Sequence, residues 1–241
     1  MEQAPSLTSE TGHGKARALG VSVGLTIAAT ALSAIAGVLI AVPLFVLGLD
    51  IESTAVIVSL LISGQIGFFA VGYLYVRRYS LSIPLERPER RDLGYAIGGA
   101  IAALVFATGA SGVLTWLGLT PGAVLEEIVA QNPIVALWMA LLSIVVVAPV
   151  EEYLFRGVIQ GRLRRTFSPP SAIVLASVLF GSLHFGNYVG SARTVVGWSL
   201  LIVGVGVVFG SIYERTNTLI VPIIAHAIYN TVLFTVGYVA L

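Results

Sequence analysis

The feature that most limits the fold of this chain is the spacing of its charged residues. Only 10% of the 241 residues are charged, against about 25% in an average soluble domain. A helix of about 20 apolar residues spans the hydrocarbon core of a bilayer. The sequence therefore predicts an all-α, polytopic membrane bundle of about seven transmembrane helices. The seven runs without Asp, Glu, Lys or Arg, each at least 20 residues long, are 19–49, 53–76, 93–125, 128–150, 166–192, 194–213 and 216–241.

Composition narrows the class of protein further. The chain is 57% hydrophobic, which excludes an ordinary soluble globule, and it has no cysteine, which excludes thiolate metal sites and cysteine nucleophiles. Residues 1–18 are polar and are predicted to form a flexible cytoplasmic tail. Residues 19–241 are predicted to form a single transmembrane helical domain in the lipid bilayer. The net charge of +1 indicates no particular partner, and we expect no nucleic acid among its partners.

The charges between the runs predict an orientation. Eleven of the thirteen basic residues lie before the first run or after the second, fourth and sixth, on one side of the membrane. Arg193 lies on the other side, and Arg156 lies within a helix. The positive-inside rule makes the basic side cytoplasmic. We therefore expect the N-terminus in the cytoplasm and the C-terminus outside, with segment 120–131 as a short interfacial helix or loop on the outer side.

Three groups of polar residues interrupt otherwise apolar helices in the second half of the chain. Acids and imidazoles at membrane depth are costly, so they mark functional sites by default. Taken singly, each could be a residue that only bridges helices, and a proton-coupled transporter would use the same residue types. The groups are Glu151, Glu152 and Arg156 in PVEEYLFRG, His184 in FGSLHFG, and His226 with Asn230 in HAIYN.

Helix geometry predicts that these groups share one depth. Glu151 lies fourteen residues before Arg165, and His184 lies fourteen residues after Pro170, on the two sides of one turn. At a rise of about 1.5 Å per residue, each lies about 21 Å from that turn. The last helix starts near Thr218, which places its polar pair in the same band. An antiparallel packing of these helices would therefore bring the groups together.

Local spacing predicts which of these side chains pair. Glu152 and Arg156 are four residues apart, so they share a helix face, and a purely structural ion pair is as open for them as a catalytic role. Glu151 points about 100° away from Glu152 and is left free for chemistry. Pro149 and Pro222 shortly precede two of the groups and can interrupt their helices.

Two shorter sequence patterns carry little weight. Gly109-Ala110-Ser111-Gly112 fits the GxSG pattern of rhomboid serine proteases, but so short a pattern is common in a chain with 26 glycines. No HExxH occurs, which excludes that zinc motif. Three glycine pairs fit GxxxG and indicate close helix packing: Gly20/Gly24, Gly157/Gly161 and Gly206/Gly210.

The three groups together resemble the motif set of the CAAX protease and bacteriocin-processing family, also called the CPBP or Abi family. EExxxR at Glu151–Arg156, FxxxH at Phe180–His184 and HxxxN at His226–Asn230 occur in the family's order along residues 145–235. The resemblance implies an intramembrane endopeptidase with its site open to the cytosol. It covers the catalytic half, about 133–241, and matches nothing in the first three helices.

The resemblance also implies roles for the residues. Glu151 would be the general base, His184 would hold or activate the water, and His226 with Asn230 would stabilise the oxyanion, supported by Glu152, Arg156 and Phe180. A metal-dependent version would use His184, His226 and Glu151 as Zn²⁺ ligands, and two histidines with a carboxylate are a plausible zinc set. The sequence leaves both versions open.

The sequence thus predicts a glutamate- or metal-dependent intramembrane protease that cleaves membrane-associated or CAAX-like protein or peptide substrates. The alternative is a proton-coupled transporter, or an immunity or interaction protein, that uses the same buried cluster. The identity of the substrate, the oligomeric state and the role of the first three helices are not predicted.

Overall fold

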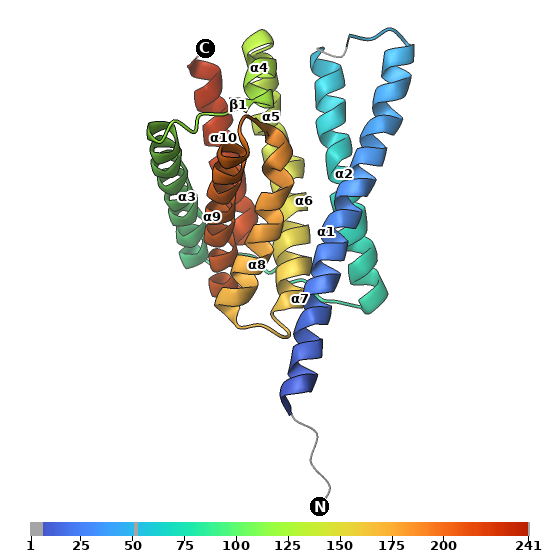
Figure 1. Cartoon of the computed structure of the whole chain (residues 1–241), viewed down its shortest axis with the longest axis vertical. Helices are drawn as coiled ribbons and strands as arrows, with labels where there is room; N and C mark the ends of the chain where they lie inside the picture. The colour runs from blue at the N-terminus through green and yellow to red at the C-terminus, as the bar shows by residue number, and fades with distance from the viewer. Residues whose placement is uncertain (1–6, 51–52, 241) are drawn as a thin grey trace, which may run out of the picture.

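The computed structural model describes residues 7–50 and 53–240, almost all of them helical (Figure 1). Two short strands, β1 and β2, are the exceptions to the helices. The elements are α1 (Leu7–Val46), α2 (Thr54–Tyr79), α3 (Arg90–Trp116), β1 (Gly122–Ala123), α4 (Val124–Gln131), α5 (Ile134–Leu142), η1 (Ser143–Val147), α6 (Ala148–Glu152), η2 (Tyr153–Gln160), α7 (Gly161–Leu163), α8 (Pro169–Ser182), η3 (Leu183–Asn187), β2 (Tyr188–Val189), α9 (Ala192–Thr216) and α10 (Ile220–Val239).

The predicted count of seven membrane spans is confirmed. Seven stretches are long and apolar enough to cross a bilayer, and α5 through α7 form one of them, Ile134–Leu163. Successive spans run in opposite directions, so α1 starts at the lower end of Figure 1 and α10 finishes at the upper end. The protein is therefore a multi-pass membrane protein. Which end faces the cytoplasm stays a prediction from the positive-inside rule.

Two boundaries differ from the sequence prediction. α1 begins at Leu7, so residues 7–18 of the predicted tail are helical, while residues 1–6 lie outside the described residues. Once a helix is nucleated, each further residue that is ordered adds one hydrogen bond. The helix can therefore continue into a polar flank. α3 ends at Trp116, before the end of its uncharged run at residue 125, because Gly118 takes a positive φ of 75° and ends the helix. Of the two alternatives for 120–131, a short helix or a loop, the structure has a short helix, α4.

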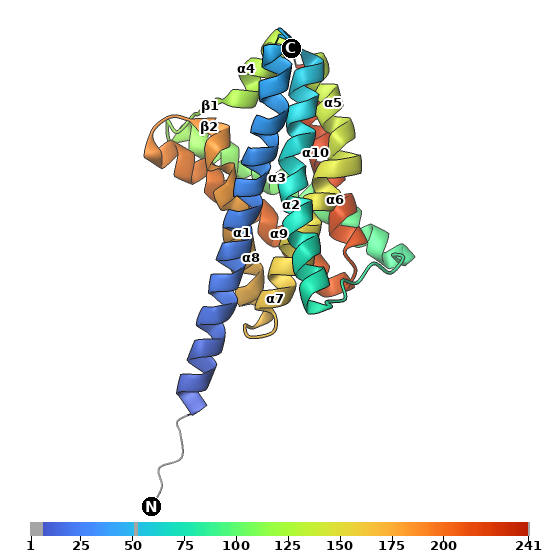
Figure 2. The same ribbon diagram turned by 90° about the vertical axis from the view of Figure 1, so that its right-hand side faces the viewer.

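The helices divide into a hairpin and a larger bundle. α1 and α2 pack mainly on each other, and the hairpin joins the bundle through contacts of α2 with α5, α6 and η2 (Figures 1 and 2). One apolar core lies between the hairpin and η2 with α8, around Leu154, Phe155 and Ile159. A second core lies among α3, α9 and α10, around Phe209 and Tyr229. The interrupted span α5–α7 is therefore enclosed by the hairpin on one side and the bundle on the other.

Two tethers fix the elements that carry the histidines. At one end of the bundle, the backbone N–H of Leu219 donates to Pro84 O (3.0 Å) and the Thr218 hydroxyl donates to Glu86 O (2.8 Å), which holds the start of α10 against loop 80–89. At the other end, β2 pairs antiparallel with β1, with Gly122 opposite Val189. This pairing anchors the residues that follow η3. Both helix ends near the polar groups are thus held by hydrogen bonds outside the site.

The crossing of α1 and α2 gives a first prediction, Gly67→Ala. A Cβ at Gly67 would collide with the backbone atoms Ser33 N and Ala29 O of α1, so the helices must separate to accept it. We expect a loss of about 1–3 kcal/mol in the free energy of unfolding, the usual cost of overpacking. Unfolding in mixed micelles measures it. The control is Gly64→Ala on the same helix, where nothing lies within 4 Å of the added Cβ; equal effects of both variants would contradict the close crossing.

Candidate active site

The span that carries the acids is not a continuous α-helix. α6, which holds Glu151 and Glu152, is flanked by the π-helices η1 and η2. π-helical turns inside α-helices are rare and frequently lie at functional sites. The interruption predicted at Pro149 is thus present, in the form of wider turns. The one suggested at Pro222 is absent, because Pro222 lies in the first turn of α10, where a missing N–H costs no hydrogen bond.

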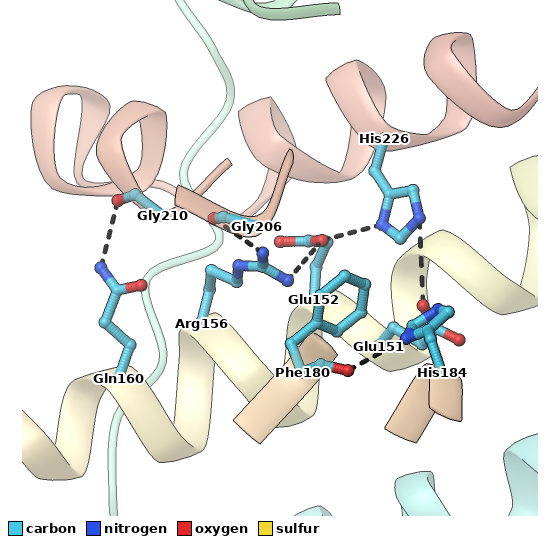
Figure 3. Close-up of polar contacts among 9 residues, drawn as sticks. All are labelled: Glu151, Glu152, Arg156, Gln160, Phe180, His184, Gly206, Gly210 and His226. Atoms are coloured by element: carbon cyan, nitrogen blue, oxygen red, sulfur yellow. Dashed lines mark hydrogen bonds and ion pairs between the residues drawn. The ribbon is translucent and has the colours of Figure 1, made fainter. Parts of the chain in front are cut away.

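A buried ion network lies at the centre of the bundle (Figure 3). Arg156 Nη1 donates to Glu152 Oε1 at 2.9 Å, which confirms the pairing predicted from their spacing. Arg156 Nη2 donates to Gly206 O on α9 at 3.0 Å. His226 Nδ1 on α10 lies 2.8 Å from the same Glu152 oxygen. Glu152 and Arg156 are at most 1% exposed, so this network joins three spans in the interior of the bundle.

Aromatic rings enclose the network. The guanidinium carbon of Arg156 lies 4.8 Å from the Phe180 ring centre and 5.7 Å from that of Phe209. Phe209 also stacks on His226, with ring centres 4.9 Å apart. Phe180 contacts both imidazoles, at 4.9 Å from His184 and 6.0 Å from His226. The Phe180 ring therefore contacts both histidines.

Hydrogen bonds fix the tautomer of each imidazole. Phe180 O is a carbonyl and only accepts, so His184 Nδ1, at 3.0 Å from it, carries the proton and Nε2 is left free. His226 Nδ1 likewise donates to the Glu152 carboxylate. The other nitrogen of His226, Nε2, lies 3.9 Å from Glu151 Oε2. Glu151 thus lies between the buried network and His184 (Figure 3).

Glu151 and His184 open on a cavity of about 290 Å³. Its other wall belongs to the α1–α2 hairpin, through Ser33, Gly64 and Gln65. This volume is at the lower end of the range of ligand pockets, about 300–1,000 Å³. A larger hollow of about 350 Å³ between α3 and α9 is lined by no acid and no histidine. We therefore place the candidate active site in the cavity beside Glu151.

The structure brings together most of the residues selected from the sequence. Glu151 and His184 lie at the cavity, and Glu152, Arg156 and His226 lie directly behind them. Asn230 does not join them: it is half-buried on α10, lines no part of this cavity, and bonds to none of the residues that the structure describes. The Ser111 hydroxyl of the GxSG pattern only donates to Thr108 O within its own helix.

Sequence reasoning did not identify several residues of the site. Gln160 lies one helical turn beyond Arg156, and its Nε2 donates to Gly210 O at 3.1 Å (Figure 3). The same nitrogen donates to Glu214 Oε1 at 3.0 Å. Added Cβ atoms would meet Arg156 Nη2 at 3.3 Å from Gly206 and Gln160 Oε1 at 2.8 Å from Gly210. The close packing predicted from the GxxxG spacing is thus confirmed for Gly206 and Gly210, where it exposes α9 carbonyls to these donors. It is wrong for Gly20 and Gly24, because nothing lies within 4 Å of a Cβ added at either position. Phe209 had no signal in the sequence.

The chemistry of the donors bears on the zinc alternative. Both Nε2 atoms are free of protein hydrogen bonds, as metal-ligating histidines require. However, no group of three or more His, Asp or Glu side chains within the described part of the chain is arranged to hold a metal ion. The residues as they lie therefore do not form a zinc site, and we derive no step through one.

The fold and the site define a multi-pass helical membrane protein with an acid–imidazole cluster beside an intramembrane cavity. Residues 133–232, from the start of α5 into α10, match the family model described as type II CAAX prenyl endopeptidase Rce1-like. This match confirms for that segment the family predicted from the three motifs, and the family implies a protease. No curated protein and no solved structure matches the chain.

Proposed function

We propose that this protein is an intramembrane endopeptidase that hydrolyses a peptide bond in membrane-associated or CAAX-like protein substrates. The observation that carries the proposal is that Glu151 and His184, which belong to two different motifs of the matched segment, meet at one cavity. Glu151 and His184 come from different spans, and both line its wall. A buried carboxylate and an imidazole with a free Nε2 are the groups that activation of water requires.

In the proposed mechanism, Glu151 is the general base. A water between the Glu151 carboxylate and His184 Nε2 gives its proton to Glu151, and its oxygen attacks the carbonyl carbon of the substrate. The carbonyl π electrons move to the oxygen. Glu151 then passes the proton to the amide nitrogen as the C–N bond breaks and the C=O bond forms again. The products are an amine and a carboxylic acid, and the acid then gives its proton to the amine. His184 orients the water, since its Nδ1 is held by Phe180 O.

The buried network supplies the electrostatics of the proposed mechanism. Glu152 pairs with Arg156 and accepts from His226 Nδ1. Pairing of this kind avoids an unpaired charge in a low-dielectric interior. His226 also lies behind Glu151, with its Nε2 3.9 Å from Glu151 Oε2. Glu152 and Arg156 are therefore positioning residues, because they reach the reaction through His226 and Phe180.

Oxyanion stabilisation by His226 and Asn230 remains a prediction from the family resemblance. Imidazole N–H and carboxamide groups are suitable donors for a developing oxyanion. Neither side chain lines the cavity in the substrate-free protein, so this role requires the substrate carbonyl to reach past Glu151.

Reconstitution in proteoliposomes tests the proposed function. Two quenched fluorescent probes serve as substrates: a farnesylated peptide that ends in a CAAX sequence, and an unprenylated single-span membrane peptide. We expect cleavage of at least one probe, with one new N-terminus identified by mass spectrometry. Vesicles that transport protons or solutes across the bilayer but cleave neither probe would instead support the transporter alternative.

Metal removal separates the two versions of the mechanism. Because the described residues gather no three-ligand cluster, we expect cleavage to continue at an unchanged rate after treatment with EDTA or phenanthroline. Metal analysis of the purified protein should then find far less than one zinc ion per chain. Loss of cleavage with chelator that returns when Zn²⁺ is added would contradict the glutamate-driven version and support His184, His226 and Glu151 as ligands.

A further inference from the structure

The cavity has a second polar wall, which belongs to a part of the chain outside the family match. Gln65 on α2 lines the cavity opposite Glu151 and His184, and residues 133–232 do not include it. Gln65 is the one Asn or Gln in the run 53–76. A carboxamide at membrane depth is costly without a hydrogen-bond partner. Its position therefore requires an explanation.

The amide oxygen of Gln65, Oε1, is buried and has no hydrogen-bond partner among the residues that the structure describes. Ser33, its neighbour on the cavity wall, is already bonded, because its hydroxyl donates to Gly64 O at 2.5 Å. Leaving a buried acceptor unsatisfied costs free energy that a bound ligand can recover. The oxygen of Gln65 is thus available to a donor that enters the cavity.

A second free amide lies across the cavity. Asn187 ends η3, three residues after His184, and lines the same cavity. Asn187 is exposed, and its side chain makes no hydrogen bond to the described part of the protein, so it lies at the open side of the cavity. The backbone behind it is held by the pairing of β2 with β1. Two carboxamides, each with a donor and an acceptor, therefore flank the acid and the imidazole from opposite walls.

We propose that Gln65 and Asn187 bind the backbone of the substrate as an extended segment between α2 and η3. This inference rests on the proposed function and names how that site holds its substrate. A peptide bond within an intact helix has its N–H and C=O already paired, so the segment must unwind before water can attack. Unwound backbone in a membrane needs new partners for each N–H and C=O group. A carboxamide has both a donor and an acceptor, so it can pair with a C=O and an N–H of the substrate backbone, as a neighbouring strand does in a β-sheet.

The proposal also gives the α1–α2 hairpin a role. Its wall faces the catalytic residues across the cavity, and the hairpin joins the bundle mainly through α2. The catalytic half supplies the groups that cleave, and the hairpin supplies the group that positions the peptide. Gln65 acts on the substrate itself and not through another residue.

Steady-state kinetics on the cleaved probe test this role. We expect Gln65→Leu to raise KM about fivefold, the equivalent of about one lost neutral hydrogen bond, while kcat changes less than twofold. Gln65→Asn keeps the amide and should recover part of the loss. The control is Ser59→Ala on the same helix, whose hydroxyl only donates to Ala55 O, and it should leave KM unchanged. An unchanged KM for Gln65→Leu, with normal cleavage by the wild type, would overturn the inference alone.

Ester substrates identify the atom that Gln65 binds. Each backbone N–H beside the scissile bond is replaced in turn by an ester oxygen, which removes one donor. We expect one ester to raise KM for the wild type but not for Gln65→Leu, because both changes remove the same bond. If every ester affects both proteins equally, Gln65 does not bind the backbone.

A binding assay separates this result from the proposed function. Fluorescence anisotropy measures the same probe on Glu151→Gln, which keeps the cavity but lacks the base. Weaker binding by the double variant Glu151→Gln/Gln65→Leu supports the inference without cleavage. Equal binding overturns it. Failure of the wild type to cleave any probe overturns the proposed function, whatever Gln65 does.

Discussion

Glu151→Gln is expected to abolish cleavage while the protein stays folded. Glutamine has nearly the shape of glutamate but cannot take a proton from water. General-base catalysis contributes about 10²- to 10⁴-fold to rate, so we expect a loss in kcat of at least this size. Glu151 is 9% exposed and contacts His226 at 3.9 Å, so its neutralisation leaves the ion pair between Glu152 and Arg156 in place. The rate of probe cleavage in proteoliposomes measures the effect.

The matched control is Glu126→Gln, an exposed glutamate on α4. It should retain the wild-type rate, and both variants should unfold at the wild-type temperature within a few degrees. Glu151→Asp keeps the carboxylate but withdraws it from the cavity, so partial activity is expected. Wild-type kcat in Glu151→Gln would show that another group activates the water.

The sequence predicted the number of spans well because that property is local. Charged residues are excluded from the hydrocarbon core one by one, so the runs between them record each crossing without knowledge of the packing. The ends of helices were less accurate, because charge spacing alone does not locate them. α3 stops at Trp116 where Gly118 turns the chain, and no charge marks that point in the sequence.

The site was predicted in part for the same reason. Glu152 and Arg156 pair within one helix, so their spacing was sufficient to find the contact. The contact of His226 on α10 with Glu152 was indicated only by a shared depth. The contact of Arg156 with Gly206 on α9 was indicated only by the spacing of packing glycines. Gln65 was not selected, because its importance depends on how the hairpin tilts against η3, which a sequence does not record. The π-helical turns around α6 depend on packing in the same way.

Arg156→Met is expected to cause the largest loss of stability. The substitution leaves Glu152, which is 0% exposed, as a buried carboxylate beside His226, and it removes the donor to Gly206 O. Removing one partner of a buried ion pair costs about 3–5 kcal/mol. The guanidinium also lies 4.8 Å from the Phe180 ring centre, and methionine keeps the packing there but not the attraction of a cation for the ring. Unfolding in mixed micelles measures the free energy.

The double variant Glu152→Gln/Arg156→Met shows whether charge is the cause. Glutamine at this position can still accept from His226 Nδ1 while no unpaired charge remains, so the double variant should be more stable than Arg156→Met alone. Arg164→Met is the control, since Arg164 pairs with Glu214 at 2.9 Å while 34% exposed, and an exposed pair contributes about 1 kcal/mol or less. If Arg156→Met and Arg164→Met cost the same, the buried network does not hold the bundle together. If the double variant is no better than Arg156→Met, the lost stability comes from the Gly206 and ring contacts and not from the buried charge.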